Sequence, residues 1–293
     1  MFEKVLICTD FADGLHRLAN FVSSFGLAGI KEIVFLHVVP LYEKGIIPRV
    51  DSEKIEQAET RLTEAVGENI TDVEVKTVVQ SGKAVETILK VAQTYKSELI
   101  ILGSQSRSLL TEKLVGSTMV DLSRQTRVPL LIVRPQLIWA YTCEELALRC
   151  QHLFRSLLIP YNGSQVADYL VQQIKHLAEK EPGKFFQQCK LCWILENSDR
   201  PRITQKILPQ QANETLYAIK ADLESVNLQV DTEIREGSCV TEFLDIAVMA
   251  DISAIAVSSG TMGKLQEWLI SSFAAEILRR SWYPVLFFPS QNS

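Results

Sequence analysis

Basic charge is scarce in this chain of 293 residues. Lysine and arginine together number 30 against 35 aspartate and glutamate residues, so the formal net charge is −5. A protein that holds a phosphodiester backbone needs a basic field on its surface. We therefore do not expect nucleic acid among its partners.

Long apolar runs are also missing. No uninterrupted run approaches the roughly 20 residues of a membrane-spanning helix, although apolar residues make up 47% of the chain. The opening MFEKVLICTDF enters an apolar run at once and lacks the charged leader and small-residue cleavage site of a secretory signal. We expect a cytoplasmic protein that does not bind membranes.

The six cysteines and four histidines form no pattern typical of a metal or catalytic site. Cys189 and Cys192 lie three residues apart in a predicted strand, so they should point to opposite faces. We interpret them as buried thiols of a reduced protein, and His37, inside an apolar run, as a core histidine. The sequence has no G-x-S-x-G elbow or visible nucleophile-base pair, and we do not expect a dedicated enzyme.

The sequence does contain a strict alternation of strand and helix patterns. In the first half, predicted strands cover Lys4–Thr9, Glu32–Val39, Val73–Val79, Leu99–Leu102 and Leu130–Val133. Helical spacing predicts helices at Asp13–Phe25, Asp51–Glu68 and Val85–Tyr95, and a fourth from Gly116. This alternation is typical of a doubly wound, Rossmann-like α/β domain with a five-stranded parallel sheet.

The same pattern then repeats. LFRSLLIPYNGSQVADYLVQQI, residues 153–174, resembles FEKVLICTDFADGLHRLANFV, residues 2–22. Pro129 and Pro284 lie 155 residues apart, and Asp10 and Asn162 lie 152 apart. We predict two tandem domains, residues 1–137 and 153–293, joined by a short connecting helix within 138–152. We expect the copies to form an internal pseudo-dimer through strands 130–133 and 285–288, which would protect both sheet edges.

The strongest ligand signal lies between residues 98 and 134. A strand ends at Gly103, a hydroxyl-rich loop follows, and Gly116-Ser117-Thr118 opens a helix. Glycines let a backbone approach a phosphate, and the N–H groups at a helix start point toward it. Further donors would come from the side chains of Ser104, Ser106 and Arg107. The alternative is an ordinary surface loop, because serine and glycine are common in turns.

Asp10 ends the first strand at the same carboxyl edge of the predicted sheet. Ligands of doubly wound folds bind at this edge, where a carboxylate can accept hydrogen bonds from ribose hydroxyls or an adenine amine. The alternative for Asp10 is a turn or a cap for the following helix.

The first half opens with VLICTDF, its second strand ends in LHVV, and two glycine positions precede an apolar strand with Pro-Leu. In these motifs it resembles the universal stress protein family, in its ATP-binding branch. It covers residues 2–134 and, more weakly, 153–289, as in tandem members of the family. It implies ATP or another adenine nucleotide as ligand, without a Walker-type lysine, and any Mg²⁺ would arrive with the phosphates.

Carried over onto this sequence, the resemblance places Asp10 and the main chain of Val38 at the adenosine end. The ribose and phosphates would face Gly103, Ser106, Gly116, Ser117 and Thr118. Ser106 replaces the second glycine of the family pattern, which implies altered or weakened binding.

The second copy departs further from the family pattern. Asn162 replaces Asp10, Ser258 replaces Gly103, and Phe273 replaces Thr118. We predict that this copy has lost nucleotide binding and serves a structural or regulatory role. The resemblance as a whole implies a stress-response regulator that binds ATP as a ligand and acts through protein partners. A nucleotide-free scaffold of the same fold is the alternative, and we also consider assembly into a homodimer.

Overall fold

The computed structural model describes residues 1–42, 49–67, 72–104, 117–181, 183–196, 208–258 and 272–289. They form two compact units, one of residues Phe2–Gln151 and one of His152–Ser293 together with Met1. No helix in these described ranges is both long and apolar enough to cross a membrane.

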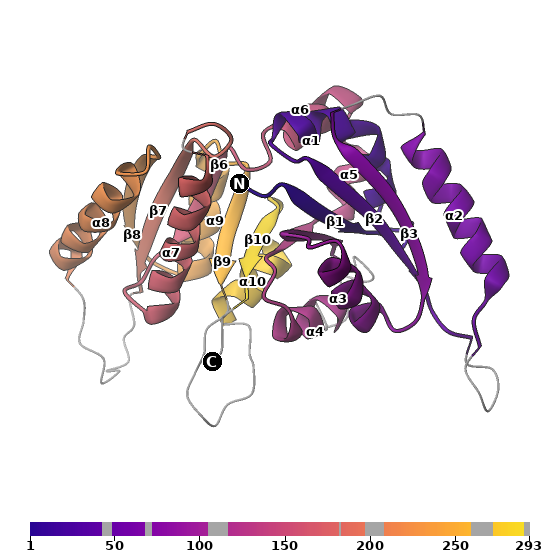
Figure 1. The fold of residues 1–293 in the computed structure, drawn as a ribbon. Helices are drawn as coiled ribbons and strands as arrows, with labels where there is room; N and C mark the ends of the chain where they lie inside the picture. Colours follow the sequence, from indigo (N-terminus) through magenta and orange to yellow (C-terminus); the bar gives the residue numbers. More distant parts are fainter. Residues whose placement is uncertain are drawn as a thin grey trace. The chain divides into compact units, whose positions relative to one another are not determined.

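A five-stranded parallel sheet forms the centre of the first unit (Figure 1). Its strands are β1 (Lys4–Cys8), β2 (Glu32–Val39), β3 (Glu74–Ser81), β4 (Leu99–Gly103) and β5 (Leu130–Val133). They lie in the order β3-β2-β1-β4-β5. Most positions of β1, β4 and β5 are buried, as expected for strands with helices on both faces. The predicted doubly wound fold is confirmed.

Helices cover both faces of this sheet (Figure 1). The 3₁₀-helix η1 (Leu15–Phe21) with α1 (Val22–Leu27) and α2 (Ser52–Val66) connects β1, β2 and β3 on one face. On the other face, α3 (Ala84–Thr94) and α4 (Ser117–Gln125) connect β3, β4 and β5. The order of strands reverses at β4, so right-handed crossovers require this change of face.

The first helix differs from its prediction over Asp13–Phe25. It begins only at Leu15, as a 3₁₀-helix, because residues 10–14 form a tight loop. The carboxylates of Asp10 and Asp13 bind the amides of this loop, and Gly14 has a φ of 71°. A left-handed residue does not fit inside a right-handed helix, so the helix starts after Gly14.

The segment that connects the two sheets forms two helices, α5 (Pro135–Ala140) and α6 (Cys143–Gln151), rather than the single one predicted. Arg17 of η1 donates hydrogen bonds to the carbonyls of Ile138 and Tyr141, at 2.5 and 3.2 Å. Basic side chains often bind the last carbonyls of a helix in this way. The end of α5 is therefore fastened to the first helix of the unit.

The second unit has the same arrangement of strands and helices. Its parallel strands are β6 (Ser156–Pro160), β7 (Gln188–Leu195), β8 (Gln229–Glu236), β9 (Ala254–Ser258) and β10 (Val285–Phe288), in the order β10-β9-β6-β7-β8. Its helices are α7 (Gln165–Lys180), α8 (Pro209–Glu224), α9 (Cys239–Met249) and α10 (Ser272–Arg280). The predicted duplication is confirmed. The expected pairing of residues 130–133 with 285–288 concerns how the units are placed and stays a prediction.

Candidate functional site

The first sheet has a switch point between β1 and β4. These two strands are neighbours, but the chain leaves β1 toward η1 and α1, and leaves β4 toward α4 on the opposite face. The loops that follow the two strands therefore separate at the carboxyl edge. Ligands of open α/β sheets bind in the crevice that such a separation leaves. Asp10 follows β1 at this point, and Gly103 and Ser104 end β4.

Asp10 forms the turn that the sequence suggested as the alternative role for it. Its Oδ1 accepts hydrogen bonds from the amides of Ala12 and Asp13, both at 2.9 Å, which forms an Asx turn. The residue is exposed, and its Oδ2 has no hydrogen-bond partner among the described residues. One oxygen thus shapes the loop, and the other is an open acceptor.

Asp13 is a residue of this loop that the sequence reasoning missed. Its Oδ1 accepts from the Thr9 hydroxyl at 2.8 Å and the Leu15 amide at 2.9 Å, and its Oδ2 accepts from the Asp10 amide at 3.3 Å. Burial raises the pKa of Asp13, against the effect of these hydrogen bonds, and the charge of Asp10 adds to the rise. The signal in the sequence was a second acid three residues after the first, a spacing common in capped turns.

Gly103 is packed against Asp13. A Cβ added to Gly103 would lie 2.7 Å from the Cβ of Asp13 and 3.2 Å from its Oδ2. Carbon atoms in contact normally lie about 3.5–4.0 Å apart, so no larger residue fits without movement. The sequence reasoning assigned this glycine to the approach of a phosphate, but the space is taken by the first loop.

The main chain of Val38 lies open where the β1–β2 ladder ends. The Thr9 amide donates to the Leu36 carbonyl at 2.9 Å, and the next bond of a parallel ladder would join the Val38 amide to the Thr9 carbonyl. That carbonyl instead meets Nδ1 of His37 at 2.8 Å. Among the described residues no hydrogen bond joins the Val38 amide to Thr9, so we interpret this amide as open at the end of β1.

The remaining predicted residues divide between described and undescribed parts. The Ser104 amide donates to the Val133 carbonyl at 2.9 Å, so only its hydroxyl is available. Ser117 is the exposed first residue of α4, and Thr118 is half-buried. Ser106, Arg107 and Gly116 lie outside the described residues.

Phe11, a residue of this loop, belongs to a cluster of aromatic rings. Phe11 has a φ of 64°, which is uncommon for a bulky residue and indicates local strain. Its ring lies 4.4 Å from the His37 ring and 4.3 Å from the Arg61 guanidinium carbon. His16 packs edge-on at 5.6 Å, and burial and the charge of Arg61 lower the pKa of this histidine. His37 has a hydrogen-bond partner, as expected, but it is half-buried and so lies at the margin of the core in which it was predicted.

The second copy keeps the turn after its first strand, but large aromatic side chains pack beside it. Gly163 has a φ of 72°, close to that of Phe11. The Trp193 ring packs against Gly163, with Cη2 3.1 Å from a Cβ added there, so a side chain at this position would meet that ring. Asn162 Oδ1 accepts from the Ser164 amide at 3.1 Å, which repeats the turn of Asp10. Tyr161 packs on Trp193 and donates to Asp168 at 2.6 Å.

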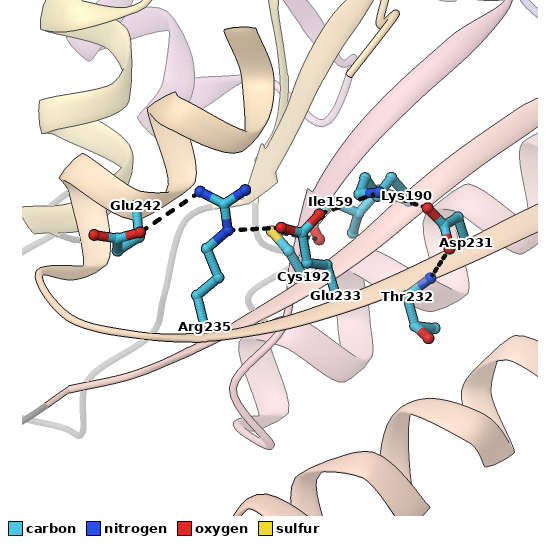
Figure 2. A network of polar contacts seen from close by, with 8 residues as sticks. All are labelled: Ile159, Lys190, Cys192, Asp231, Thr232, Glu233, Arg235 and Glu242. Carbon is cyan, nitrogen blue, oxygen red and sulfur yellow. Dashed lines mark hydrogen bonds and ion pairs between the residues drawn. The ribbon is translucent and has the colours of Figure 1, made fainter. Parts of the chain in front are cut away.

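The second unit also carries a strip of charge on β7 and β8 (Figure 2). Lys190 pairs with Asp231 and Glu233 at 2.5 and 3.1 Å, and Arg235 pairs with Glu233 and Glu242 at 2.6 and 3.6 Å. Each of these five side chains is paired with a charge of opposite sign, so we interpret the strip as a structural network along the edge strand β8.

The predicted buried thiols agree with the structure of β7. Cys189 and Cys192 are free and buried, and burial raises the pKa of both. Cys192 donates a weak hydrogen bond to the Ile159 carbonyl at 3.7 Å (Figure 2). In the described parts of the chain, histidine, cysteine and acidic side chains form no group of three or more that could hold a metal ion.

Comparisons with known proteins identify the family of both units. The model of the universal stress protein family matches residues 1–134 and again residues 153–289. The chain is similar to the universal stress protein MJ0577 of Methanocaldococcus jannaschii, with 25% identity over 156 residues that cover 46% of this chain and 96% of that protein.

Two solved structures resemble the chain over almost its whole length. A universal stress protein from Archaeoglobus fulgidus has a TM-score of 0.68 and 19% identity, with 97% of each chain covered. A universal stress protein assigned as putative from Pseudomonas aeruginosa has a TM-score of 0.58 and 15% identity, with 98% of this chain and 93% of that one covered. At these identities the likeness concerns the fold. The chain belongs to the universal stress protein family and contains two domains of that family.

Proposed function

We propose that the first unit binds ATP or a related adenine nucleotide at its switch point. The observation that carries this proposal is a pair of unsatisfied polar groups, the Asp10 Oδ2 acceptor and the Val38 amide donor, at one edge of the sheet. The edge of adenine offers the complementary pair, an amine that donates and a ring nitrogen that accepts. The family resemblance of the first half supports the same ligand.

The phosphates would extend toward the start of α4. This helix has nine residues, and Ser117 and Thr118 place two hydroxyls in its first turn. The positive end of the helix dipole favours an anion there. Ser106, Arg107 and Gly116 would complete this end, and a Mg²⁺ ion, where present, would arrive on the phosphates.

We propose that ATP acts as a ligand that changes the protein's state and its protein partners, and that the protein is not a dedicated enzyme. The second unit would serve as a structural or regulatory partner. In that unit Trp193 and Tyr161 fill the space around the first loop, and Phe273 packs its ring against Phe243 at 5.2 Å.

Calorimetric titration tests the proposal. Wild-type protein at millimolar ATP should bind one nucleotide per chain, and Asp10→Ala should remove most of the affinity. Asn162→Ala is the matched control, because it changes the same loop position in the second copy. Absence of binding by the wild type, or equal affinity in Asp10→Ala, would reject the proposed site.

A nucleotide-free scaffold remains the second candidate. It is favoured by Asn162, which repeats the turn of Asp10 without a carboxylate and so gives Asp10 a purely structural explanation. Mass spectrometry of freshly purified, denatured protein separates the two. Co-purified adenine nucleotide in the wild type, and its loss in Asp10→Ala, would argue against the scaffold.

A further inference from the structure

Hydrogen-bond donors on both sides of Asp10 converge on the carboxylate of Asp13. They are the hydroxyl of Thr9, the amide of Asp10 and the amide of Leu15. One side chain therefore ties the end of β1 to the start of η1, and Asp10 lies within the segment that it closes.

The two aspartates also bind each other's main chain. Asp10 Oδ1 accepts from the Asp13 amide at 2.9 Å, and Asp13 Oδ2 accepts from the Asp10 amide at 3.3 Å. This reciprocal pair fixes the orientation of the Asp10 carboxylate. It also determines which oxygen is used in the turn and which remains open.

Gly103, at the end of the neighbouring strand β4, leaves room for the Asp13 side chain. The three nearest atoms to an added Cβ all belong to Asp13, so the absence of a side chain at the end of β4 is what lets Asp13 settle there. The first loop thereby acquires a fixed position relative to the strand that leads into the predicted phosphate loop.

The second copy offers an internal comparison. Ser258 stands at the position of Gly103, and its hydroxyl donates to the Val166 carbonyl at 3.1 Å. Gln165 stands at the position of Asp13 and is exposed. The copy with Asp10 has the Asp13–Gly103 pair, and the copy with Asn162 has neither member.

We infer that Asp13 is a positioning residue for adenine recognition: seated against Gly103, it holds the Asp10 carboxylate so that Oδ2 faces the ligand. This inference rests on the proposed function. Asp13 then affects binding only through Asp10 and makes no contact of its own with the nucleotide.

A double-mutant cycle on ATP affinity tests this dependence. Asp13→Asn keeps the size of the side chain but replaces an accepting oxygen by an N–H₂ group, so at least one of the three hydrogen bonds is lost. We expect ATP to bind about fivefold to tenfold more weakly, the effect of one lost hydrogen bond. In the Asp10→Ala background the same change should have no further effect. An equal loss in both backgrounds, an unchanged affinity or tighter binding by Asp13→Asn would overturn the inference.

Amide hydrogen exchange tests the same inference without nucleotide. In Asp13→Asn, exchange should accelerate at Leu15, which loses its acceptor, and also at Ala12, whose amide is held by Asp10. Unchanged protection at Ala12 would overturn the inference. Asp72→Asn, an exposed acid of the same unit, is the control and should leave both amides unaffected. If the wild type fails to bind ATP while Ala12 loses protection, the proposed function is wrong but the positioning of Asp10 by Asp13 holds.

Discussion

We expect Gly103→Ala to destabilise the first unit. The reason does not lie in the backbone of Gly103, which has no left-handed φ and so does not itself require glycine. The added Cβ would lie 2.7 Å from the Cβ of Asp13, so the two segments must separate by about 1 Å to reach a normal contact. Such overpacking costs about 1–3 kcal/mol. Alanine restricts the unfolded chain and returns about 0.4–1 kcal/mol, which leaves a net loss of about 1–2 kcal/mol over the middle of these two ranges.

Thermal unfolding followed by circular dichroism measures this effect. A loss of this size in a unit of about 150 residues lowers Tm by roughly 2–8 °C. In an Asp13→Gly background the added Cβ meets no Cβ, so Gly103→Ala should cost nothing further. An undiminished loss in that background would refute the contact as the cause.

Three further predictions follow from the charges of the first unit. Because the pKa of Asp13 is raised by burial, the stability that its protonated form contributes is present below the ordinary carboxyl pKa and is lost as pH rises through the raised value. The Tm of wild type relative to Asp13→Asn should therefore fall as pH rises from about 4, the ordinary carboxyl value, through the raised pKa, and a rise would contradict this. Burial alone would raise the pKa of Glu32, but hydrogen bonds from two lysines leave it below the ordinary value. Glu32→Gln should therefore cost about 1 kcal/mol of stability at neutral pH, discounted for the exposure of the lysines. In urea unfolding, the difference in unfolding free energy between wild type and Glu32→Gln should close as pH falls through the lowered pKa. Arg61→Gln should move the pKa of His16 partly back toward its ordinary value, because burial is the larger cause and remains; NMR titration of the imidazole measures this, and an unmoved pKa would count against the charge of Arg61 as a cause.

The fold could be predicted from periodicity because its sheets are covered by helices on both faces. Strands β2 and β5 have the bounds that were predicted. Both strands are largely buried, so the run of apolar residues in the sequence ends where the strand ends. Periodicity failed where side chains bind the main chain. Gly14 and two aspartates delay the first helix, and Thr142 and Glu145 bind each other's amides at 3.3 and 2.9 Å to start α6. That capping box was readable from the sequence.

The candidate site could be predicted only in part. The position of Asp10 at the carboxyl edge followed from the order of elements, and the structure brings it together with Val38 and Gly103. The role of Gly103 could not be predicted, because the reason for that glycine lies in Asp13, about 90 residues away in sequence. Contacts of this kind leave no local pattern, whereas the spacing of Asp10 and Asp13 did leave one.

Native mass spectrometry with ATP tests the central claim most directly. The account predicts one adenine nucleotide per chain in the wild type and in Asn162→Ala, and a strongly reduced occupancy in Asp10→Ala at the same ATP concentration. Two nucleotides per chain, or a single nucleotide that survives Asp10→Ala, would contradict the assignment of binding to the first unit through Asp10.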